Sequence, residues 1–392
     1  MKQVFSRSQR HLSIGTIGHH GHGKTTLTAA LLSYLGRREL ADATAVRYLD
    51  QTRDEKALGR TIVRSQVEYC GRDYHFTHID CPGHHTYGKN VFVGAAQLDA
   101  AILVVSAADG VCAQTREHLL LARQAGVQSI IVFLNKCDLH DDQDRQVVVE
   151  EEVRALLSSY GFPGDAVPVI RGSALAAREE ARGGESAIGQ LLDAVEAYVS
   201  VPERRVDLPF VMPIADVMYI SGRGVVVTGR IQQGSLSTGT DVELVGLEPS
   251  RTTRVTGLET FKQRLDYGEP GDNVGIMLRG LKREDVRRGQ VLAAPGKLTP
   301  RTKVVGEVAI LTGQEGGRHT PFRSGYRPQF FVHTADVPCT LTLPEGAEMA
   351  MPGDNLRLHI ELDKPVVIEK GQTFALRDGG TIGAGTIVEI IV

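Results

Sequence analysis

The sequence has no tryptophan, 5% aromatic residues and no run of 18 or more apolar residues. The missing tryptophan excludes nothing, but the missing apolar run argues against a membrane-spanning helix. Residues 1–10 are polar and lack the apolar segment of a secretory signal, so we expect none. With 42% hydrophobic and 23% charged residues over 392 positions, the composition is typical of a soluble globular protein of two or three domains.

Cysteine is scarce and scattered, with only Cys70, Cys81, Cys112, Cys137 and Cys339. An odd number without a C-x-x-C pair argues against a disulfide framework or a zinc site and favours a reducing cytoplasm. Positive charge is not in excess either, because the formal net charge is -3. A dedicated non-specific nucleic-acid binder is usually clearly basic. Any contact with RNA should therefore be local, through a patch or through shape.

The first half of the sequence alternates short apolar runs with amphipathic stretches. The apolar runs predict buried strands at residues 13–17, 74–79, 101–106, 129–134 and 167–171. The amphipathic stretches predict helices at residues 25–35, 115–124, 146–160 and 187–199. This alternation predicts an α/β domain with a doubly wound, mostly parallel sheet covered by helices on both faces.

The pattern changes after residues 201–203, Val-Pro-Glu. From Leu208 onward, short β-rich runs are separated by glycine-containing turns, which is typical of small antiparallel barrels. A second break falls at residues 298–300. We therefore predict three domains, whose ranges are 1–203 for the α/β domain, 208–297 for a first all-β barrel and 300–392 for a second.

The strongest chemical signal is the segment of residues 18–25, Gly-His-His-Gly-His-Gly-Lys-Thr. It fits the G-x-x-x-x-G-K-[ST] pattern and lies between a predicted strand and a predicted helix, as a phosphate-binding loop requires. Its glycines let backbone N–H groups converge on phosphate oxygens at a helix N-terminus. Lys24 would contact the β- and γ-phosphates, and the Thr25 hydroxyl would ligate Mg²⁺. The segment predicts a P-loop nucleotide-binding domain.

A second segment, Asp-Cys-Pro-Gly-His at residues 80–84, ends an apolar strand. A carboxylate at Asp80 can hold the Mg²⁺ shell through water, and the Gly83 N–H can sense the γ-phosphate.

A third segment, Asn-Lys-Cys-Asp at residues 135–138, selects the base. Asp138 can accept hydrogen bonds from the guanine N1–H and exocyclic amine, which adenine does not offer. Asn135 can reach the N7 and O6 edge, the Lys136 stem can lie over the ring, and residues 173–175 can donate a backbone N–H to O6. The predicted GTP-binding and GDP-binding residues are Gly18, His19, His20, Gly21, His22, Gly23, Lys24, Thr25, Thr26, Asp80, Cys81, Pro82, Gly83, His84, Asn135, Lys136, Cys137, Asp138, Ser173, Ala174 and Leu175.

Further motifs extend this pattern along essentially the whole chain, at residues 15–18, 114–118, 221–224, 227–230, 316–322, 326–330 and 351–355. Together with the three nucleotide segments, these motifs resemble bacterial elongation factor Tu, a translational GTPase. The resemblance implies a GTPase that carries aminoacyl-tRNA to the ribosomal A site and releases it on GTP hydrolysis. It implies Mg²⁺, the ribosome and an exchange factor of the elongation factor Ts type as partners, and a cytoplasmic monomer without membrane contact.

The resemblance also implies residue roles. His84 would be the catalytic residue that positions the attacking water, and Thr61 would join Thr25 as a Mg²⁺ ligand in the GTP state. Glu259 would stack on the terminal adenosine of tRNA, whereas Arg288 and other cations are equally consistent with ordinary solvated charges. Exchange-factor positions are Gln114, His118 and Glu348. The implied tRNA-binding residues are Lys89, Asn90, Gln66, Met218, Glu259, Asn273, Arg288, Arg318, His319 and Arg377.

Several positions near the γ-phosphate depart from the family pattern. His20 stands in place of valine, Gly21 in place of aspartate and Arg60 in place of isoleucine. The valine and isoleucine form an apolar gate that restrains the catalytic histidine, so both gate positions are polar here. Arg60 could stabilise transition-state charge and raise intrinsic hydrolysis, or two cationic groups could hold the switch open. Other departures are His85, Thr86, Gly88, Gln66 and Met218.

Two interpretations of these departures stay open. One is drift in a chain that still carries aminoacyl-tRNA. The other is a specialised regulatory or antibiotic-resistance paralogue with impaired tRNA delivery. The tRNA-end residues disfavour a metabolic GTPase of the sulfate-activation type. A metal site is disfavoured because no ligand spacing supports one, despite a set of histidines at His19, His20, His22, His84 and His85.

A substitution of Asp138 tests the choice of base. Asp138→Asn replaces an acceptor pair by a donor and an acceptor, so preference should shift from guanine to xanthine nucleotides. A lost buried polar pairing of this kind typically changes discrimination by ~10⁴-fold. Calorimetry with GDP, XDP and ADP measures the shift, and wild-type protein that binds ATP as tightly as GTP would contradict this interpretation.

Overall fold

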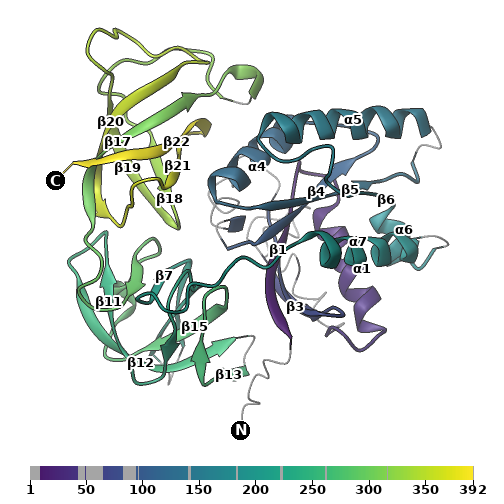
Figure 1. Ribbon diagram of the computed structural model, residues 1–392, viewed down its shortest axis with the longest axis horizontal. Coiled ribbons are helices and arrows are strands. Elements are labelled where there is room, and N and C mark those ends of the chain that lie inside the picture. The colour runs from purple at the N-terminus through teal and green to yellow at the C-terminus, as the bar shows by residue number, and fades with distance from the viewer. Residues whose placement is uncertain are drawn as a thin grey trace. The chain divides into compact units, whose positions relative to one another are not determined.

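The computed structural model describes residues 9–42, 49, 65–82, 94–95, 97–139, 143–181, 184–220, 224–260, 263–315 and 317–391. The chain divides into two compact units, Gln9–Pro202 and Glu203–Val392. Figure 1 shows the first unit as a sheet with helices and the second as β-structure. Among the described residues, no helix is both long and apolar enough to cross a membrane.

The first unit contains a six-stranded sheet in the order β2-β3-β1-β4-β5-β6. All neighbouring pairs are parallel except β2 and β3, which are antiparallel. The strands are β1 (Arg10–Ile17), β2 (Ser65–Cys70), β3 (Tyr74–Asp80), β4 (Ala100–Ser106), β5 (Ser129–Asn135) and β6 (Val169–Arg171). The helices are α1 (Lys24–Gly36), α4 (Ala113–Gln124), α5 (Gln143–Ser159), α6 (Ala174–Arg178) and α7 (Gly184–Tyr198).

Both faces of this sheet are buried, as β4 shows. Its residues alternate between two apolar clusters, with Ile102 and Val104 in one and Leu103 and Val105 in the other. The first cluster contains residues of α1 and α7, and the second contains residues of α4 and α5. A strand that is covered on both sides reads as a continuous apolar run, which is why the sequence reveals it.

The predicted strands and long helices of this unit are confirmed, with ends that differ by a few residues. Two described elements were not predicted. The strand β2 is the antiparallel edge of the sheet, where only alternate residues are well buried, so it lacks an apolar run. The helix α6 has five residues, too few for a helical pattern to be recognised.

The second unit begins with an eight-stranded sheet in the order β7-β16-β11-β12-β15-β9-β8, with β13 paired to β12. A two-stranded ribbon of β10 and β14 accompanies it. The elements are β7 (Val211–Pro213), β8 (Asp216–Ile220), β9 (Gly224–Arg230), β10 (Leu236–Ser237), β11 (Asp241–Val245), β12 (Arg251–Thr260), β13 (Gln263–Leu265), β14 (Tyr267–Gly268), β15 (Asn273–Leu278), the 3₁₀ helix η3 (Arg283–Asp285) and β16 (Val291–Ala293).

The rest of the second unit is a closed barrel of six strands, in the order β17-β20-β19-β18-β21-β22. Phe330 and Phe374 stack in its core with ring centroids 4.7 Å apart. Its elements are β17 (Arg301–Ile310), the 3₁₀ helix η4 (Gly313–Glu315), β18 (Gln329–Val332), β19 (Ala335–Thr342), β20 (Asn355–Val366), β21 (Thr373–Asp378) and β22 (Gly380–Ile391). The predicted fold class, an α/β domain followed by β-rich domains, is confirmed.

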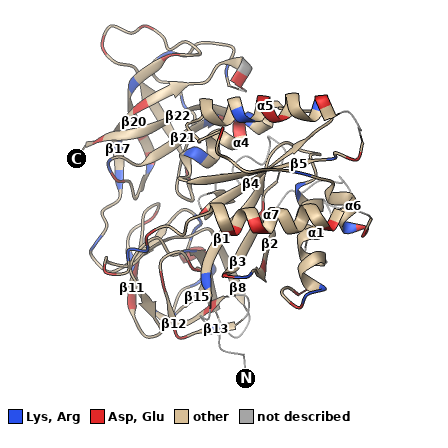
Figure 2. Ribbon diagram, turned by 45° about the vertical axis from the view of Figure 1, so that its right-hand side comes forward, with Lys and Arg blue, Asp and Glu red and all other residues tan. Residues whose placement is uncertain are grey.

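Charged side chains of both signs are spread over the described chain, and α5 carries acidic and basic residues side by side (Figure 2). This distribution fits the small net charge of -3. No long stretch of one sign stands out on the described ribbon, in line with the expectation that any RNA contact is local.

Candidate nucleotide-binding site

The candidate site lies where parallel strands of the first unit end. The segment 18–25 follows β1, residues 81–82 follow β3, residues 136–138 follow β5 and residues 173–175 come just after β6. Because β3, β1, β4, β5 and β6 are parallel neighbours, their carboxyl ends lie along the same edge of the sheet, the one where the strands end. In open α/β sheets, ligands bind outside that edge.

Two glycines allow the phosphate-binding loop to adopt its path. Gly18 has φ +131°, and a Cβ there would lie 2.4 Å from the Val104 carbonyl oxygen. Gly23 has φ +92°, and a Cβ there would lie 2.3 Å from the Asn135 side-chain nitrogen. Because L side chains rarely adopt such φ values and both sites are too close to a neighbour, only glycine fits at either position.

Lys24 lies inside the loop that it is predicted to serve. Its ammonium group donates to the carbonyl oxygens of Gly18 at 3.0 Å and His19 at 2.8 Å. Burial lowers the pKa of Lys24 to about 8, although Asp80 and Cys81 oppose the shift. Neutral carbonyls only partly offset the free-energy cost of removing the charged ammonium from water. Phosphate oxygens would therefore be strong additional partners.

Asp80 is held between two threonine hydroxyls. Thr16 Oγ1 donates to Asp80 Oδ1 and Thr25 Oγ1 donates to Asp80 Oδ2, each at 2.6 Å. Asp80 is buried, which leaves its carboxylate fixed at the end of β3. A hydroxyl and a carboxylate are hard oxygen ligands of the kind that Mg²⁺ prefers, so these residues fit the predicted ion.

Asn135 joins two of the predicted segments. Its side-chain nitrogen donates to the His22 carbonyl at 2.8 Å, and its Oδ1 accepts the backbone N–H of Ala174 at 2.8 Å. Any contact with the base must therefore use its second amide hydrogen. The Ala174 N–H is likewise used inside the protein, which leaves the predicted contact with guanine O6 to the other N–H groups of residues 173–175.

Lys136 has φ +61°, a left-handed conformation that is uncommon for a non-glycine residue. Such backbone strain often occurs at functional sites. The Lys136 ammonium lies 3.4 Å from Asp109 Oδ2, which anchors its stem. Asp138, two residues further on, is exposed and therefore accessible to a base.

The segment around α4 holds the loop from another side. The backbone N–H of Gly18 donates to His118 Nδ1 at 2.9 Å, and that of His20 donates to Gln114 Oε1 at 3.2 Å. His118 is buried. The family resemblance implied only an exchange-factor contact for Gln114 and His118, whereas both side chains also bind the phosphate-binding loop.

His22 is packed beneath the loop. Its Nδ1 accepts the backbone N–H of Ser106 at 3.2 Å. Burial and, to a lesser extent, the neighbouring His19 lower the pKa of His22 to about 4, while Asp109 opposes the shift. His22 is therefore neutral at physiological pH.

Some predicted residues lie outside the described residues, so their roles stay predictions. These are Thr61, Gly83, His84, Lys89 and Asn90, together with the departures Arg60, His85, Thr86 and Gly88.

Three of the predicted tRNA residues lie in one sheet of the second unit. Met218 is on β8, Asn273 on β15 and Glu259 on β12, and the sheet order in this region is β12-β15-β9-β8. Glu259 pairs with Gly275 of β15, while Asn273 is buried and Met218 is 43% exposed. Gln66 lies on β2 of the other unit.

Arg288 lies at a basic cavity of about 400 Å³ within the second unit. Burial lowers the pKa of Arg288, and Asp216 and Asp336 oppose the shift. A half-buried guanidinium at a cavity is suited to a phosphate group. The cavity is lined by Leu247, Arg283, Arg287, Arg288, Asp336, Val337, Pro338 and Lys364.

The remaining predicted tRNA residues lie in the closed barrel region. Arg318 lies over the Tyr326 ring at 4.5 Å and within 3.5 Å of Asp378. His319 is the next residue along the chain. Arg377 is 6% exposed and donates to Thr381 Oγ1 at 3.2 Å, so its contacts inside the protein account for its position.

The loop, its lysine, the paired threonine and aspartate, and the Asn-Lys-Cys-Asp segment together define a P-loop guanine-nucleotide-binding protein. Comparison with family models agrees. The elongation factor Tu GTP-binding domain matches residues 9–201, elongation factor Tu domain 2 matches 224–293 and the elongation factor Tu C-terminal domain matches 297–391. The chain therefore belongs to the elongation factor Tu family of translational GTPases.

Sequence reasoning missed several residues that shape this site. Thr16 holds Asp80, Asp109 pairs with Lys136, and Cys112 lies beside His22. Thr16 is an ordinary strand residue by sequence, and neither Asp109 nor Cys112 has a motif spacing to the loop. No sequence signal identified them, since only the folded sheet brings them to the loop.

Substitutions of two glycines test the geometry of the loop. Gly23→Ala adds a methyl group 2.3 Å from Asn135, whereas Gly21→Ala meets nothing within 4 Å. Both have positive φ, so backbone strain is common to the pair and the close contact is the difference. We expect Gly23→Ala to weaken GDP binding by ~10²-fold or more, as misplacement of a positioned group can cost. Equal loss in the two variants, measured by calorimetry, would contradict this account.

The buried Lys24 predicts a pH dependence of nucleotide binding. Phosphates favour the charged ammonium, so the pKa of Lys24 should rise above its free value of about 8 on binding. Binding then takes up a proton above that pH, and GDP affinity should fall by up to ~10-fold per pH unit, with little change below it. Calorimetry between about pH 6.5 and 9 in two buffers counts the proton, with Lys24→Arg as the permanently charged control. A flat profile in wild type would refute the shift.

Proposed function

We propose that this protein is an elongation factor that binds aminoacyl-tRNA in its GTP state, delivers it to the ribosomal A site and releases it on GTP hydrolysis. The observation that carries the proposal is the joint presence of the nucleotide site and the two β-rich domains of the family in one chain. The tRNA-end positions on these domains support it, namely Met218, Glu259, Asn273 and Arg288.

In the nucleotide site, Lys24 would leave the Gly18 and His19 carbonyls and pair with the β- and γ-phosphates. Thr25 and Asp80 would hold Mg²⁺, which neutralises charge on the triphosphate. Asp138 would accept hydrogen bonds from the guanine N1–H and amine. The two hydrogen bonds of the Asn135 side chain would hold the base-binding and phosphate-binding segments at a fixed separation. His84 would position the attacking water.

The switch would work through segments that respond to the γ-phosphate. Thr61 and Gly83 would bind near it in the GTP state and be released after hydrolysis, which changes the affinity for tRNA. The tRNA would be recognised by its A-form acceptor helix and 3′ end rather than by base sequence. Glu259 would stack on the terminal adenosine, and Arg288 at its basic cavity would take a phosphate.

Exchange of GDP for GTP would involve α4. Gln114 and His118 accept the backbone N–H groups of His20 and Gly18, so a partner that displaces α4 removes two supports of the phosphate-binding loop. We propose a partner of the elongation factor Ts type for this step, with Glu348 as a further contact. We propose that the protein acts in the cytoplasm, where translation takes place, and that it acts as a monomer.

A second candidate is a specialised paralogue with altered GTPase control and impaired delivery. The observation that favours it is the phosphate-binding loop itself, where His20 and Gly21 are exposed and replace the apolar and acidic residues of the family. His20 cannot act as an apolar gate, because its ring offers hydrogen bonds and charge. The matching position, Arg60, lies outside the described residues.

A protection assay separates these functions. Purified protein with GTP should slow the deacylation of labelled aminoacyl-tRNA, and with GDP it should not. Affinity should fall as salt rises, because phosphates are paired by cations such as Arg288. Absence of protection at low salt, in protein that binds GTP, would favour the specialised paralogue.

A matched pair of variants assigns the tRNA contact. Arg288→Ala should weaken tRNA binding and reduce the salt slope by ~1, because one phosphate contact is lost. Arg357→Ala is the control, since Arg357 is an exposed barrel residue that pairs with Glu389 at 3.0 Å and lies outside the proposed contact set. Equal effects of the two variants would remove Arg288 from the interface.

A further inference from the structure

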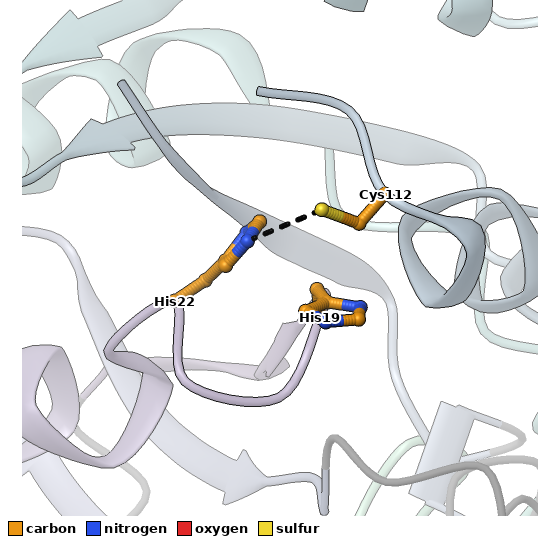
Figure 3. Close-up of side chains that lie close together, drawn as sticks. All are labelled: His19, His22 and Cys112. Atoms are coloured by element: carbon orange, nitrogen blue, oxygen red, sulfur yellow. Dashed lines mark hydrogen bonds between the residues drawn. The ribbon is translucent and has the colours of Figure 1, made fainter. Parts of the chain in front are cut away.

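Three side chains with metal-binding atoms converge beside the phosphate-binding loop. His19 and His22 belong to the loop, and Cys112 is the residue just before α4 (Figure 3). One ligand atom from each lies within 4.8 Å of the others. His22 Nε2 and Cys112 Sγ are 3.7 Å apart.

This donor set has the chemistry of a zinc site. Zinc binds imidazole nitrogen at about 2.0–2.1 Å and thiolate sulfur at about 2.3 Å in tetrahedral geometry. Two such ligands lie about 3.6 Å apart around one ion, so His22 and Cys112 are already at coordinating separation. Asp109 Oδ2 lies 3.9 Å from His22 Nε2, within reach of the same position.

The sequence argued against a metal because it lacks ligand spacing, and in one respect that interpretation was incomplete. Cys112 is 90 residues from His22 and forms no pair with another cysteine. The parallel pairing of β1 with β4 brings the two segments together, since each segment follows one of these strands. The fold thus supplies a cysteine that no local pattern reveals.

We propose that His19, His22 and Cys112 form a binding site for one zinc-class ion, with Asp109 or water as the fourth ligand. The site is distinct from the proposed Mg²⁺ position, where Thr25 would be a ligand and Asp80 would hold the ion through water. A thiolate and two imidazoles select a softer ion than these hard oxygen ligands do.

Binding has one structural cost. His22 Nδ1 accepts the Ser106 backbone N–H, and coordination through Nε2 puts the proton on Nδ1. The contact between these two nitrogens must therefore be given up. It is 3.2 Å long, at the upper end of an N–H hydrogen bond, so a single weak bond is exchanged for metal–ligand bonds.

Such an ion would tie the loop to the segment that begins α4. The His22 carbonyl accepts the Asn135 side-chain N–H, and His19 lies three residues earlier in the same loop, so both histidines belong to the framework of the nucleotide site. A bound ion adds a third link to those made by Gln114 and His118. It would therefore slow the release of GDP, a consequence that rests on the proposed function.

The first experiment measures the site itself. Reduced, full-length protein with GDP and Mg²⁺ is titrated with Co²⁺, a spectroscopic substitute for Zn²⁺. We expect one Co²⁺ per chain, with a thiolate charge-transfer band and tetrahedral visible bands. Cys112→Ser should abolish the charge-transfer band and weaken binding by more than ~100-fold, beyond the 10–100-fold typical of an outer-shell partner.

Cys70→Ser is the matched control, because Cys70 is also a half-buried free cysteine and lies on β2, outside the proposed site. It should bind Co²⁺ as wild type does. No charge-transfer band in wild type, or an unchanged band in Cys112→Ser, overturns the site.

The second experiment measures release of a fluorescent GDP analogue at constant Mg²⁺. Zn²⁺ at one equivalent should slow release by ~10-fold in wild type and Cys70→Ser, and leave Cys112→Ser unchanged. Equal rates with and without Zn²⁺ in protein shown to bind Co²⁺ overturn the effect on release. Failure to bind GDP at all would refute the proposed nucleotide function, whereas the Co²⁺ titration would still decide the site.

Discussion

The nucleotide site depends on the two hydrogen bonds made by the side-chain amide of Asn135. It ties the phosphate-binding loop at His22 to the segment after β6 at Ala174. The close approach requires a glycine at residue 23, because any Cβ there would meet the amide nitrogen. Base recognition and phosphate recognition come from loops far apart in sequence, and this one buried amide keeps them in a fixed relation.

The same loop is supported by a second set of contacts from the region of α4. His118 and Gln114 accept its backbone N–H groups, and Ser106 donates to His22. A buried backbone N–H without a partner is costly, so movement of α4 is coupled to the conformation of the loop. Nucleotide affinity and the position of α4 are thus properties of one hydrogen-bonded framework.

The two β-rich domains carry the residues proposed to contact tRNA. Met218, Glu259 and Asn273 are separated in sequence but share neighbouring strands, because antiparallel pairing sets their register. Arg288 and nearby cations line a cavity, and partial burial lowers the pKa of the Arg288 guanidinium. Residues placed on the strands of a sheet are held more precisely than residues on loops, which suits a proposed contact with the end of a nucleic acid.

The sequence by itself determined the α/β domain, its buried strands and the three nucleotide segments. Continuous apolar runs mark strands that are covered on both faces, and the spacing of glycine, lysine and threonine in residues 18–25 is local. Such local patterns can be recognised in the sequence without knowledge of the fold. The edge strand β2 and the short helix α6 could not be recognised in this way, since neither contains enough residues of one periodicity.

Only the tertiary structure decided which side chains meet. The roles of Thr16 and Asp109, the use of both amide atoms of Asn135, and the approach of Cys112 to His22 depend on strand register. A sequence specifies the periodicity of each element, whereas contacts between elements follow from how the sheet aligns strands that are many residues apart. That alignment places a thiol beside a phosphate-binding loop, where no motif predicts it.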